Sequence, residues 1–130
     1  METIHSSEMC ASLKPFLSSK HKFGKKFFCF GYNGYAIKII DHLQERGINI
    51  TAILDNNKLK HGDSYFGIEI VPPISIMEYD TENCVVFIAS YHYSEMAAQL
   101  SDMGFIGMVF ASPKVIIPSS IPEFMGILEQ

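Results

Sequence analysis

Four short apolar segments along the chain have the hydrophobic pattern of strands that are buried on both faces. They span residues 26–30, 49–54, 84–89 and 105–110. Continuous apolar runs of this length are typical of parallel sheets, in which both faces are covered by other elements. Residues 68–71 form a shorter extended segment, and the two prolines that follow it open a short helix through Met77.

Apolar side chains at helical spacing predict two helices between these strands. In the first helix they are Ala36, Ile39, Ile40 and Leu43, and in the second they are Met96, Ala97, Leu100 and Met103. We expect Gly47 and Gly104 to end the two helices, and Ser94 to cap the start of the second. The alternation predicts an α/β fold, a doubly wound parallel sheet of about four to five strands in a single small domain.

The predicted sheet occupies residues 25–112, and segments of different character flank it. Residues 1–24 are basic and irregular, with a short helix as one alternative. The lysines of this region and its border are Lys14, Lys20, Lys22, Lys25 and Lys26. They form either a solvated leader or a basic arm that contacts phosphates or an anionic surface. Residues 113–130 form an apolar tail interrupted by prolines, which we expect to pack on the domain or on a partner.

Composition limits the class of protein. The chain has 130 residues, of which 48% are hydrophobic, and this fits one domain with one core. Its net charge of -4 argues against nucleic acid as the main ligand. Because only 18% of the residues are charged, we expect part of the surface to be covered in a homo-oligomer or by a partner catalytic domain.

The number and spacing of the cysteines indicate a reducing compartment and argue against a metal site. Cys29 and Cys84 lie in apolar runs, where cysteine behaves as a small hydrophobic residue, and with Cys10 they form no metal-ligand pattern. An odd cysteine count without a disulfide framework fits a reducing compartment. The sequence has no signal-peptide pattern and no apolar stretch of about 18 residues. We therefore expect a cytoplasmic protein with no membrane span and no bound metal.

The turn after the first strand is the first candidate ligand site, because ligands of open parallel sheets lie beyond the carboxyl ends of the strands. Gly31 permits a tight turn, and Gly34 lets the start of the following helix approach a phosphate group. In the dinucleotide pattern G-x-G-x-x-G, Asn33 stands at the second glycine and Ala36 at the third. Tyr32 and Tyr35 complete the turn. A tight turn without a ligand is the alternative.

Asp55 ends the second strand, about 20 residues beyond the glycine turn, where an acidic residue can bond ribose hydroxyl groups. Asn56 and Asn57 follow it. All three residues also suit an Asx-turn that opens the next loop, so a purely structural role is the alternative.

A third candidate segment follows the strand at 84–89. Ser90 can donate to a phosphate, and the ring of Tyr91 can stack on a base. His92 is a candidate general base, because its ordinary pKa lies near neutrality. However, the spacing identifies no nucleophile or orienting acid for it. His61 lies in a polar loop, where we expect it to be solvated.

Three sequence segments together resemble a known family. They are Phe-Gly-Tyr-Asn-Gly-Tyr-Ala at 30–36, Ile-Leu-Asp-Asn-Asn-Lys-Leu-Lys-His-Gly at 53–62 and Phe-Gly-Ile-Glu-Ile-Val-Pro-Pro at 66–73. They resemble the Rossmann-like domain of bacterial surface-polysaccharide biosynthesis. That domain stands at the front of sugar-nucleotide acetyltransferases and nucleotide-sugar dehydratases, and is attached to some glycosyltransferases and methyltransferases.

The resemblance implies binding of a nucleotide sugar, with the glycine turn near the phosphates and the acidic turn near the nucleoside. The implied contacts are Gly31, Asn33, Gly34, Asp55 and Asn56. In the acetyltransferases the catalytic base lies in a following β-helix of hexapeptide repeats, and this sequence has no such repeats. It also has no Tyr-x-x-x-Lys motif of short-chain dehydrogenases. The resemblance therefore supports binding and leaves a reaction without support.

The first hypothesis is a nucleotide or nucleotide-sugar binding module of glycan biosynthesis, without its own catalytic domain. A UDP- or CDP-linked ligand is favoured over NAD. One alternative is an enzyme that acts on a nucleotide sugar through His92 or Asp55. The others are a structural or interaction domain that binds no ligand and an NAD-binding regulatory domain.

Overall fold

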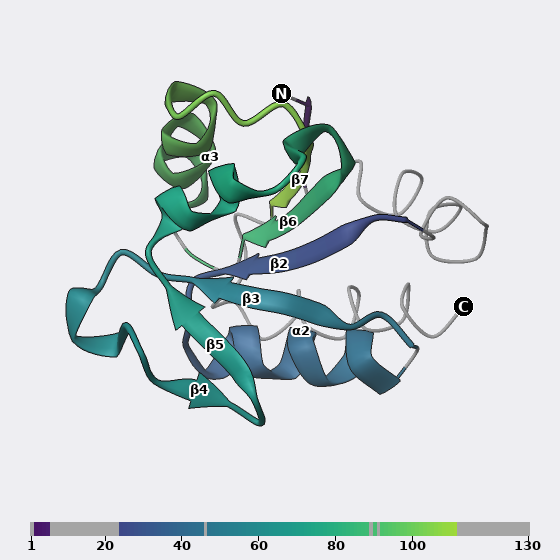
Figure 1. Cartoon of the computed structure of the whole chain (residues 1–130), viewed down its shortest axis with the longest axis vertical. Coiled ribbons are helices and arrows are strands. Elements are labelled where there is room, and N and C mark those ends of the chain that lie inside the picture. The colour runs from purple at the N-terminus through teal and green to yellow at the C-terminus, as the bar shows by residue number, and fades with distance from the viewer. Residues whose placement is uncertain (1, 6–23, 46, 89, 91, 112–130) are drawn as a thin grey trace.

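The computed structural model describes residues 2–5, 24–45, 47–88, 90 and 92–111 (Figure 1). The helix considered within residues 1–24 and the apolar tail at 113–130 lie outside these residues, apart from a strand at Glu2–His5. The proposed roles of both flanking segments stay predictions.

The described elements alternate between strands and helices. The strands are β1 (Glu2–His5), β2 (Lys26–Phe30), β3 (Ile50–Leu54), β4 (Ser64–Tyr65), β5 (Ile68–Val71), β6 (Cys84–Ile88) and β7 (Met108–Ala111). The α-helices are α2 (Gly34–Glu45) and α3 (Tyr93–Asp102), and short 3-10 helices span Lys58–Lys60 (η2), Pro73–Glu78 (η3) and Thr81–Asn83 (η4). The apolar runs thus predict the strands β2, β3, β5 and β6 and both α-helices closely.

The strands form one sheet in the order β1-β7-β6-β2-β3-β5-β4, and this confirms the α/β, Rossmann-like doubly wound fold. Neighbouring strands of the described sheet run parallel, except that β4 runs antiparallel to β5. The chain runs outward from β2 through β3 to β5 and then crosses back to β6 on the other side of β2. This crossing creates the switch point at which ligands of such sheets lie.

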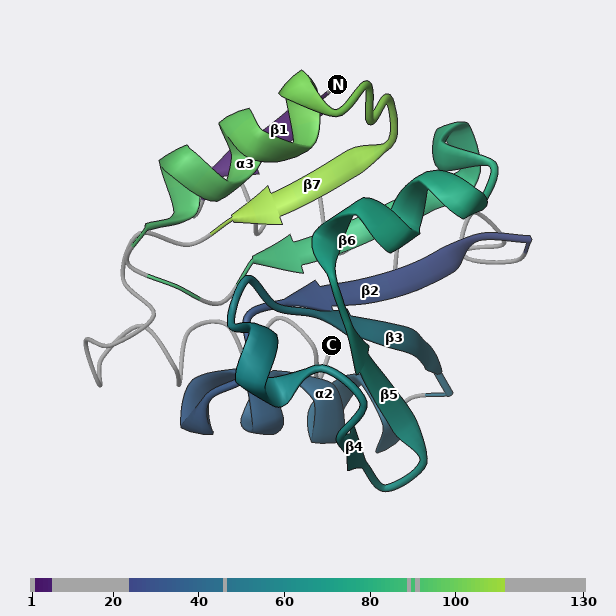
Figure 2. The same ribbon diagram turned by 60° about the vertical axis from the view of Figure 1, so that its left-hand side comes forward.

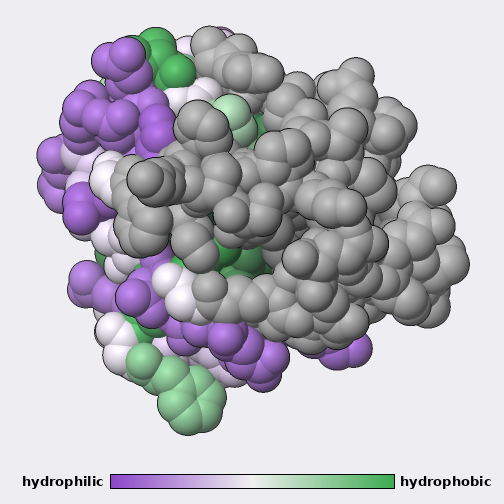
Figure 3. Space-filling view, turned by 90° about the vertical axis from the view of Figure 1, so that its right-hand side faces the viewer, coloured by the Kyte–Doolittle hydropathy of each residue, from purple (hydrophilic) through white to green (hydrophobic). Residues whose placement is uncertain are grey.

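Two strands, β1 and β4, were not predicted from the hydrophobic pattern. β1 pairs with β7, more than a hundred positions along the chain, so no local pattern reveals it. β4 has two residues and pairs with β5 through a turn at Phe66 and Gly67, both of which have positive φ (48° and 82°). In the space-filling view an apolar group projects at the lower end of the molecule, where Figure 1 places this hairpin (Figure 3).

Alternate side chains of the strands enter two separate cores, one on each face of the sheet. From β2, Phe27 and Cys29 pack on the face that α2 covers, whereas Phe28 and Phe30 pack on the opposite face. That second face is covered by α3 and by the 3-10 helix η3 (Figure 2). Both faces of β2 are therefore buried, as its continuous apolar run predicts.

The two α-helices end just before the glycines predicted from the sequence, but the second does not begin at the predicted serine cap. Past α2, Gly47 has φ +78°, and the N–H of Ile48 donates to the carbonyl of Leu43 at 2.9 Å, a glycine-type helix end. Gly104, with φ +95°, follows α3. The prediction that Ser94 caps α3 is wrong, because the helix begins at Tyr93 and its N-cap is His92.

The strand predicted over 105–110 begins later, at Met108. The N–H of Phe105 still donates to the carbonyl of Leu100 at 3.0 Å, so this residue belongs to the end of α3 rather than to the sheet. Gly107 is packed so tightly that an added Cβ would lie 2.3 Å from the carbonyl oxygen of Cys84. The apolar run from 105 therefore marks the burial of Phe105, Val109 and Phe110, but Ile106 is 60% exposed and the strand starts only at Met108.

Candidate functional site

The carboxyl ends of β2, β3 and β6 meet around a cavity of about 230 Å³ at the switch point. It is lined by Phe30, Gly31, Tyr32, Asn33, Asp55, Asn56, Lys60, Ser90 and Met96. The three segments predicted from the sequence thus come together in one place. Tyr91 lies outside the described residues, as does the side chain of Tyr35.

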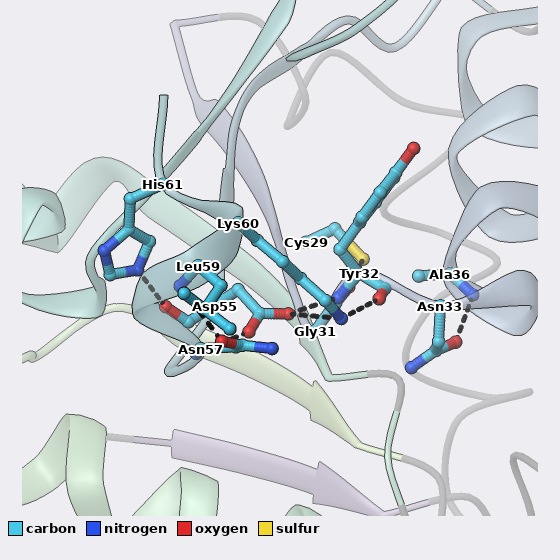
Figure 4. Close-up of polar contacts among 10 residues, drawn as sticks. All are labelled: Cys29, Gly31, Tyr32, Asn33, Ala36, Asp55, Asn57, Leu59, Lys60 and His61. Atoms are coloured by element: carbon cyan, nitrogen blue, oxygen red, sulfur yellow. Dashed lines mark hydrogen bonds and ion pairs between the residues drawn. The ribbon is translucent and has the colours of Figure 1, made fainter. Parts of the chain in front are cut away.

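Asp55 joins the turn after β2 to the turn after β3. Its side chain accepts two backbone hydrogen bonds, from Tyr32 N–H to Oδ2 at 2.8 Å and from Asn57 N–H to Oδ1 at 2.7 Å (Figure 4). The bond to Asn57 is the Asx-turn that the sequence indicated as an alternative. Asp55 is 8% exposed, and a carboxylate has about four acceptor positions. The structural role therefore leaves capacity to accept from a ligand hydroxyl group.

Lys60 is a site residue that the sequence pattern did not indicate. Its Nζ donates to the carbonyl of Tyr32 at 2.8 Å, lies 3.7 Å from Oδ2 of Asp55 and stands 5.9 Å from the centre of the Tyr32 ring (Figure 4). It belongs to η2, whose first turn is capped by the side chain of Asn57. In the sequence, Lys60 is distinguished only by its place soon after the acidic turn, and the loop around it has the composition of a polar, solvated segment.

The two glycines of the turn after β2 differ in whether the backbone would tolerate a side chain. Gly31 has φ +105°, and its N–H donates to the carbonyl of Leu54 at 2.7 Å, so a side chain here would be strained. Gly34 has no positive φ, and an added Cβ would meet nothing within 4 Å. The fold itself therefore does not require glycine at position 34.

Asn33, which departs from the dinucleotide pattern, has a local structural role. Its Oδ1 accepts from the N–H of Ala36 at 2.9 Å, the bond of a helix N-cap at the start of α2 (Figure 4). This cap satisfies one of the N–H groups that have no partner within the helix. The asparagine therefore stabilises the helix at the position where dinucleotide-binding chains have glycine.

The segment after β6 reaches the cavity through Ser90. Its Oγ accepts from the N–H of His92 at 3.0 Å. The side chain of His92 is 74% exposed, with Nδ1 3.8 Å from the equally exposed carboxylate of Glu95, and His92 does not line the cavity. The geometry therefore gives the hypothesis of catalysis by His92 no support.

A pair of amides connects the two halves of the site. Asn56, which lines the cavity, donates to Oε1 of Gln99 at 3.0 Å, and Gln99 donates back to Oδ1 of Asn56 at 2.9 Å. Gln99 lies on α3, so the pair links the loop after β3 to the helix after β6. Gln99 was not among the residues predicted from the sequence.

Near the site, the prediction that His61 is solvated is wrong, whereas the prediction that Cys29 is buried is confirmed. His61 is not merely solvated, because its Nε2 lies 2.6 Å from the carbonyl oxygen of Asp55. A carbonyl only accepts, so Nε2 carries the proton. Cys29 is fully buried, as expected for a small hydrophobic residue, and burial, with the charge of Asp55 adding to it, raises the pKa of its thiol to about 12. It is therefore no nucleophile near neutral pH.

The described part of the chain has neither a cluster of metal-ligating side chains nor a membrane-spanning helix. Within it, no three side chains of His, Cys, Asp or Glu gather as they would around a metal ion. No helix there is both long and apolar enough to cross a membrane.

Comparison with known proteins gives similarity in structure but not in sequence. No protein-family model and no curated protein matches the chain. UDP-D-quinovosamine 4-dehydrogenase from Vibrio fischeri aligns with a TM-score of 0.52 and 18% identity, over 65% of this chain and 76% of that one. RSP, a Rex-family repressor, aligns with a TM-score of 0.50 and 14% identity, over 86% of this chain and 69% of that one. At these identities the likeness concerns the fold, and the chain is a Rossmann-like α/β domain.

Proposed function

We propose that the domain binds a nucleotide or nucleotide sugar in the cavity at the switch point. The observation that carries this proposal is the joint lining of one cavity by the glycine turn, an acidic residue and a lysine. A phosphate group needs backbone N–H donors and positive charge, and a ribose needs a hydroxyl acceptor. The lysine and the acidic residue line this cavity, and the N-terminus of α2, where the first N–H groups have no partner within the helix, follows directly after the glycine turn.

The phosphates would lie against the glycine turn and the start of α2. There the positive end of the helix dipole favours an anion, and Gly34 leaves room beside the backbone. Asp55 would accept from ribose hydroxyl groups. The proposed ligand contacts are Gly31, Tyr32, Asn33, Gly34, Tyr35, Asp55, Asn56, Ser90 and Tyr91.

We further propose that the chain serves glycan biosynthesis as a cytoplasmic binding module, in a homo-oligomer or beside a partner catalytic domain. The motifs at 30–36, 53–62 and 66–73 support this assignment. So does the likeness of the fold to an enzyme that is named for a UDP-sugar. Binding is favoured over an enzymatic reaction because Asp55 is held by backbone donors and the exposed His92 does not line the cavity.

Binding of NAD is a second candidate, favoured by the strand order. The hydrophobic pattern predicted a sheet of about four to five strands, and a sheet of that size would supply one mononucleotide-binding half. The sheet instead extends on both sides of β2, through β3, β5 and β4 in one direction and through β6, β7 and β1 in the other. A dinucleotide normally bridges two such halves, and one fold neighbour is a Rex-family repressor.

Calorimetric titration of the purified protein with UDP-sugars, CDP-sugars and NAD tests the proposal and separates the two candidates. We expect a dissociation constant below millimolar for one ligand class, with UDP- or CDP-sugars ahead of NAD. In Gly34→Ala that affinity falls at least about tenfold, which corresponds to about 1.4 kcal/mol. The thermal midpoint of this variant should not fall, because the added methyl group has nothing within 4 Å beyond its chain neighbours and the helix backbone, and alanine loses less backbone entropy on folding than glycine.

Lys38→Ala is the matched control, since Lys38 lies on the exposed side of the same helix. It should keep wild-type affinity and stability. Absence of binding below millimolar for all these ligands would contradict the proposal. Wild-type affinity in Gly34→Ala would place the ligand away from the start of α2.

A further inference from the structure

Lys60 has an unusual position for a residue of a polar loop, because its side chain reaches back across the site. The ammonium group bonds the carbonyl of Tyr32, which lies 28 positions earlier in the chain, and stands 3.7 Å from Asp55. Its side chain is 37% exposed, so one side faces the protein and the other faces solvent at the cavity.

The ammonium group of Lys60 has bonding capacity that its contacts with the described residues do not use. A lysine carries three N–H donors, and the contact with Tyr32 occupies one of them. The distance of 3.7 Å to Asp55 is that of an ion pair rather than of a hydrogen bond. Donors therefore remain for an oxygen that enters the cavity from solvent.

The charges around the cavity explain why an anion needs this lysine. Among the described residues that line it, Asp55 carries the negative charge and Lys60 the positive one. A phosphate that lay close to the carboxylate of Asp55 alone would be repelled by its negative charge. The ammonium group of Lys60, 3.7 Å from Oδ2 of Asp55, offsets that repulsion and itself attracts the phosphate.

We propose that Lys60 is the phosphate-contacting residue of this site and makes the domain prefer phosphorylated nucleotides over nucleosides. The inference rests on the proposed function and names the residue that decides this preference. In the bound state, Lys60 donates to a phosphate oxygen while it keeps its bond to Tyr32. Asp55 then accepts from the ribose without repelling the phosphate.

The experiment measures dissociation constants of UDP and ADP, and of uridine and adenosine, by calorimetry. The proteins are the wild type, Lys60→Ala, Lys60→Arg and Lys58→Ala. Lys58 belongs to the same 3-10 helix and is exposed, but it does not line the cavity, so it is the matched control. Thermal denaturation of each variant reports whether it is folded.

For the better-bound nucleotide, we expect Lys60→Ala to weaken the diphosphate at least about tenfold and the nucleoside less than about twofold. Lys60→Arg keeps the charge and should recover most of the affinity for the diphosphate. Lys58→Ala should stay within about twofold of wild type for both, a change of less than about 0.4 kcal/mol.

Two results would overturn the inference while the proposed function stands. One is an unchanged diphosphate affinity in Lys60→Ala. The other is an equal loss for diphosphate and nucleoside, which would mean that Lys60 only holds the glycine turn in place. A wild-type protein that binds none of the four compounds would overturn the inference and the nucleotide-binding proposal together.

Discussion

The turn after β2 and the turn after β6 face the same cavity, but the protein holds them in different ways. The backbone of Gly31 and Tyr32 is bonded to Leu54, Asp55 and Lys60, which all come from β3 or the loop after it. The described part of the turn after β6 is held by a local bond, from the N–H of His92 to Ser90.

This difference separates structural effects from effects on binding. The turn after β2 combines both roles, so a substitution there changes stability as well as the ligand site. Ser90 and His92, the described residues of the turn after β6, share one local hydrogen bond, so we expect their substitution to change stability little and a loss of binding to report the ligand directly. The following predictions measure this contrast, from the largest expected effect to the smallest.

Asp55→Ala should have the largest effect on stability. It leaves the N–H groups of Tyr32 and Asn57 without their acceptor and removes the partner of Lys60. Because hydrogen bonds to a charged group contribute about 1.5 to 3 kcal/mol each and share one carboxylate here, we expect a loss of about 3 kcal/mol. Urea denaturation followed by circular dichroism measures it.

Asp63→Ala is the control for Asp55, since Asp63 is an exposed carboxylate of the same loop. It should change stability by less than about 0.5 kcal/mol. Equal losses in the two variants would mean that Asp55 does not hold the two turns together.

Asn33→Ala should have an intermediate effect on stability. It removes the side-chain cap of α2, for which the typical loss is about 1 kcal/mol. Asn33→Ser keeps an acceptor at the same place and should lose only a few tenths of a kcal/mol, roughly. Both values come from the same denaturation experiment. A serine variant as unstable as the alanine variant would show that the cap is not the reason for the loss.

Substitutions in the turn after β6 should have the smallest effect on stability. Ser90→Ala and His92→Ala each remove at most an exposed or local contact, so we expect changes within about 0.5 kcal/mol. Ligand titration of the same variants completes the comparison. We expect Ser90→Ala to weaken binding because Ser90 lines the cavity, and His92→Ala to leave it unchanged. A destabilisation by either variant as large as that of Asp55→Ala would remove the contrast between the turns.

The sequence alone predicted most of the fold because each signal was local. The runs at 26–30 and 84–89 predicted β2 and β6 within a residue, since burial on both faces leaves few polar positions in a strand and Lys26 stands at the exposed start of β2. Gly47 ended its helix as expected, since only glycine readily adopts the left-handed conformation required there. The N-cap of α3 was predicted wrongly at Ser94, because serine favours the N-cap position but does not fix the residue at which a helix begins.

Local sequence signals predicted some residues of the candidate site and missed others. Gly31 and Asp55 follow directly after apolar strands, and the rule that carboxyl ends of parallel strands meet brings them together. Lys60 and Gln99 lie outside any such pattern. Their contacts, with Tyr32 and Asn56, depend on how a loop and a helix settle on the sheet.

What the sequence by itself determined is the set of elements and the residues at their ends, because hydrophobic periodicity and glycine conformation act within a few residues. What only the tertiary structure decided is which side chains meet across these elements. The pairing of β1 with β7, the neutralisation of Asp55 by Lys60 and the amide pair of Asn56 and Gln99 each join distant positions. Such contacts follow from the register of the sheet and the path of its loops, which no short stretch of sequence specifies.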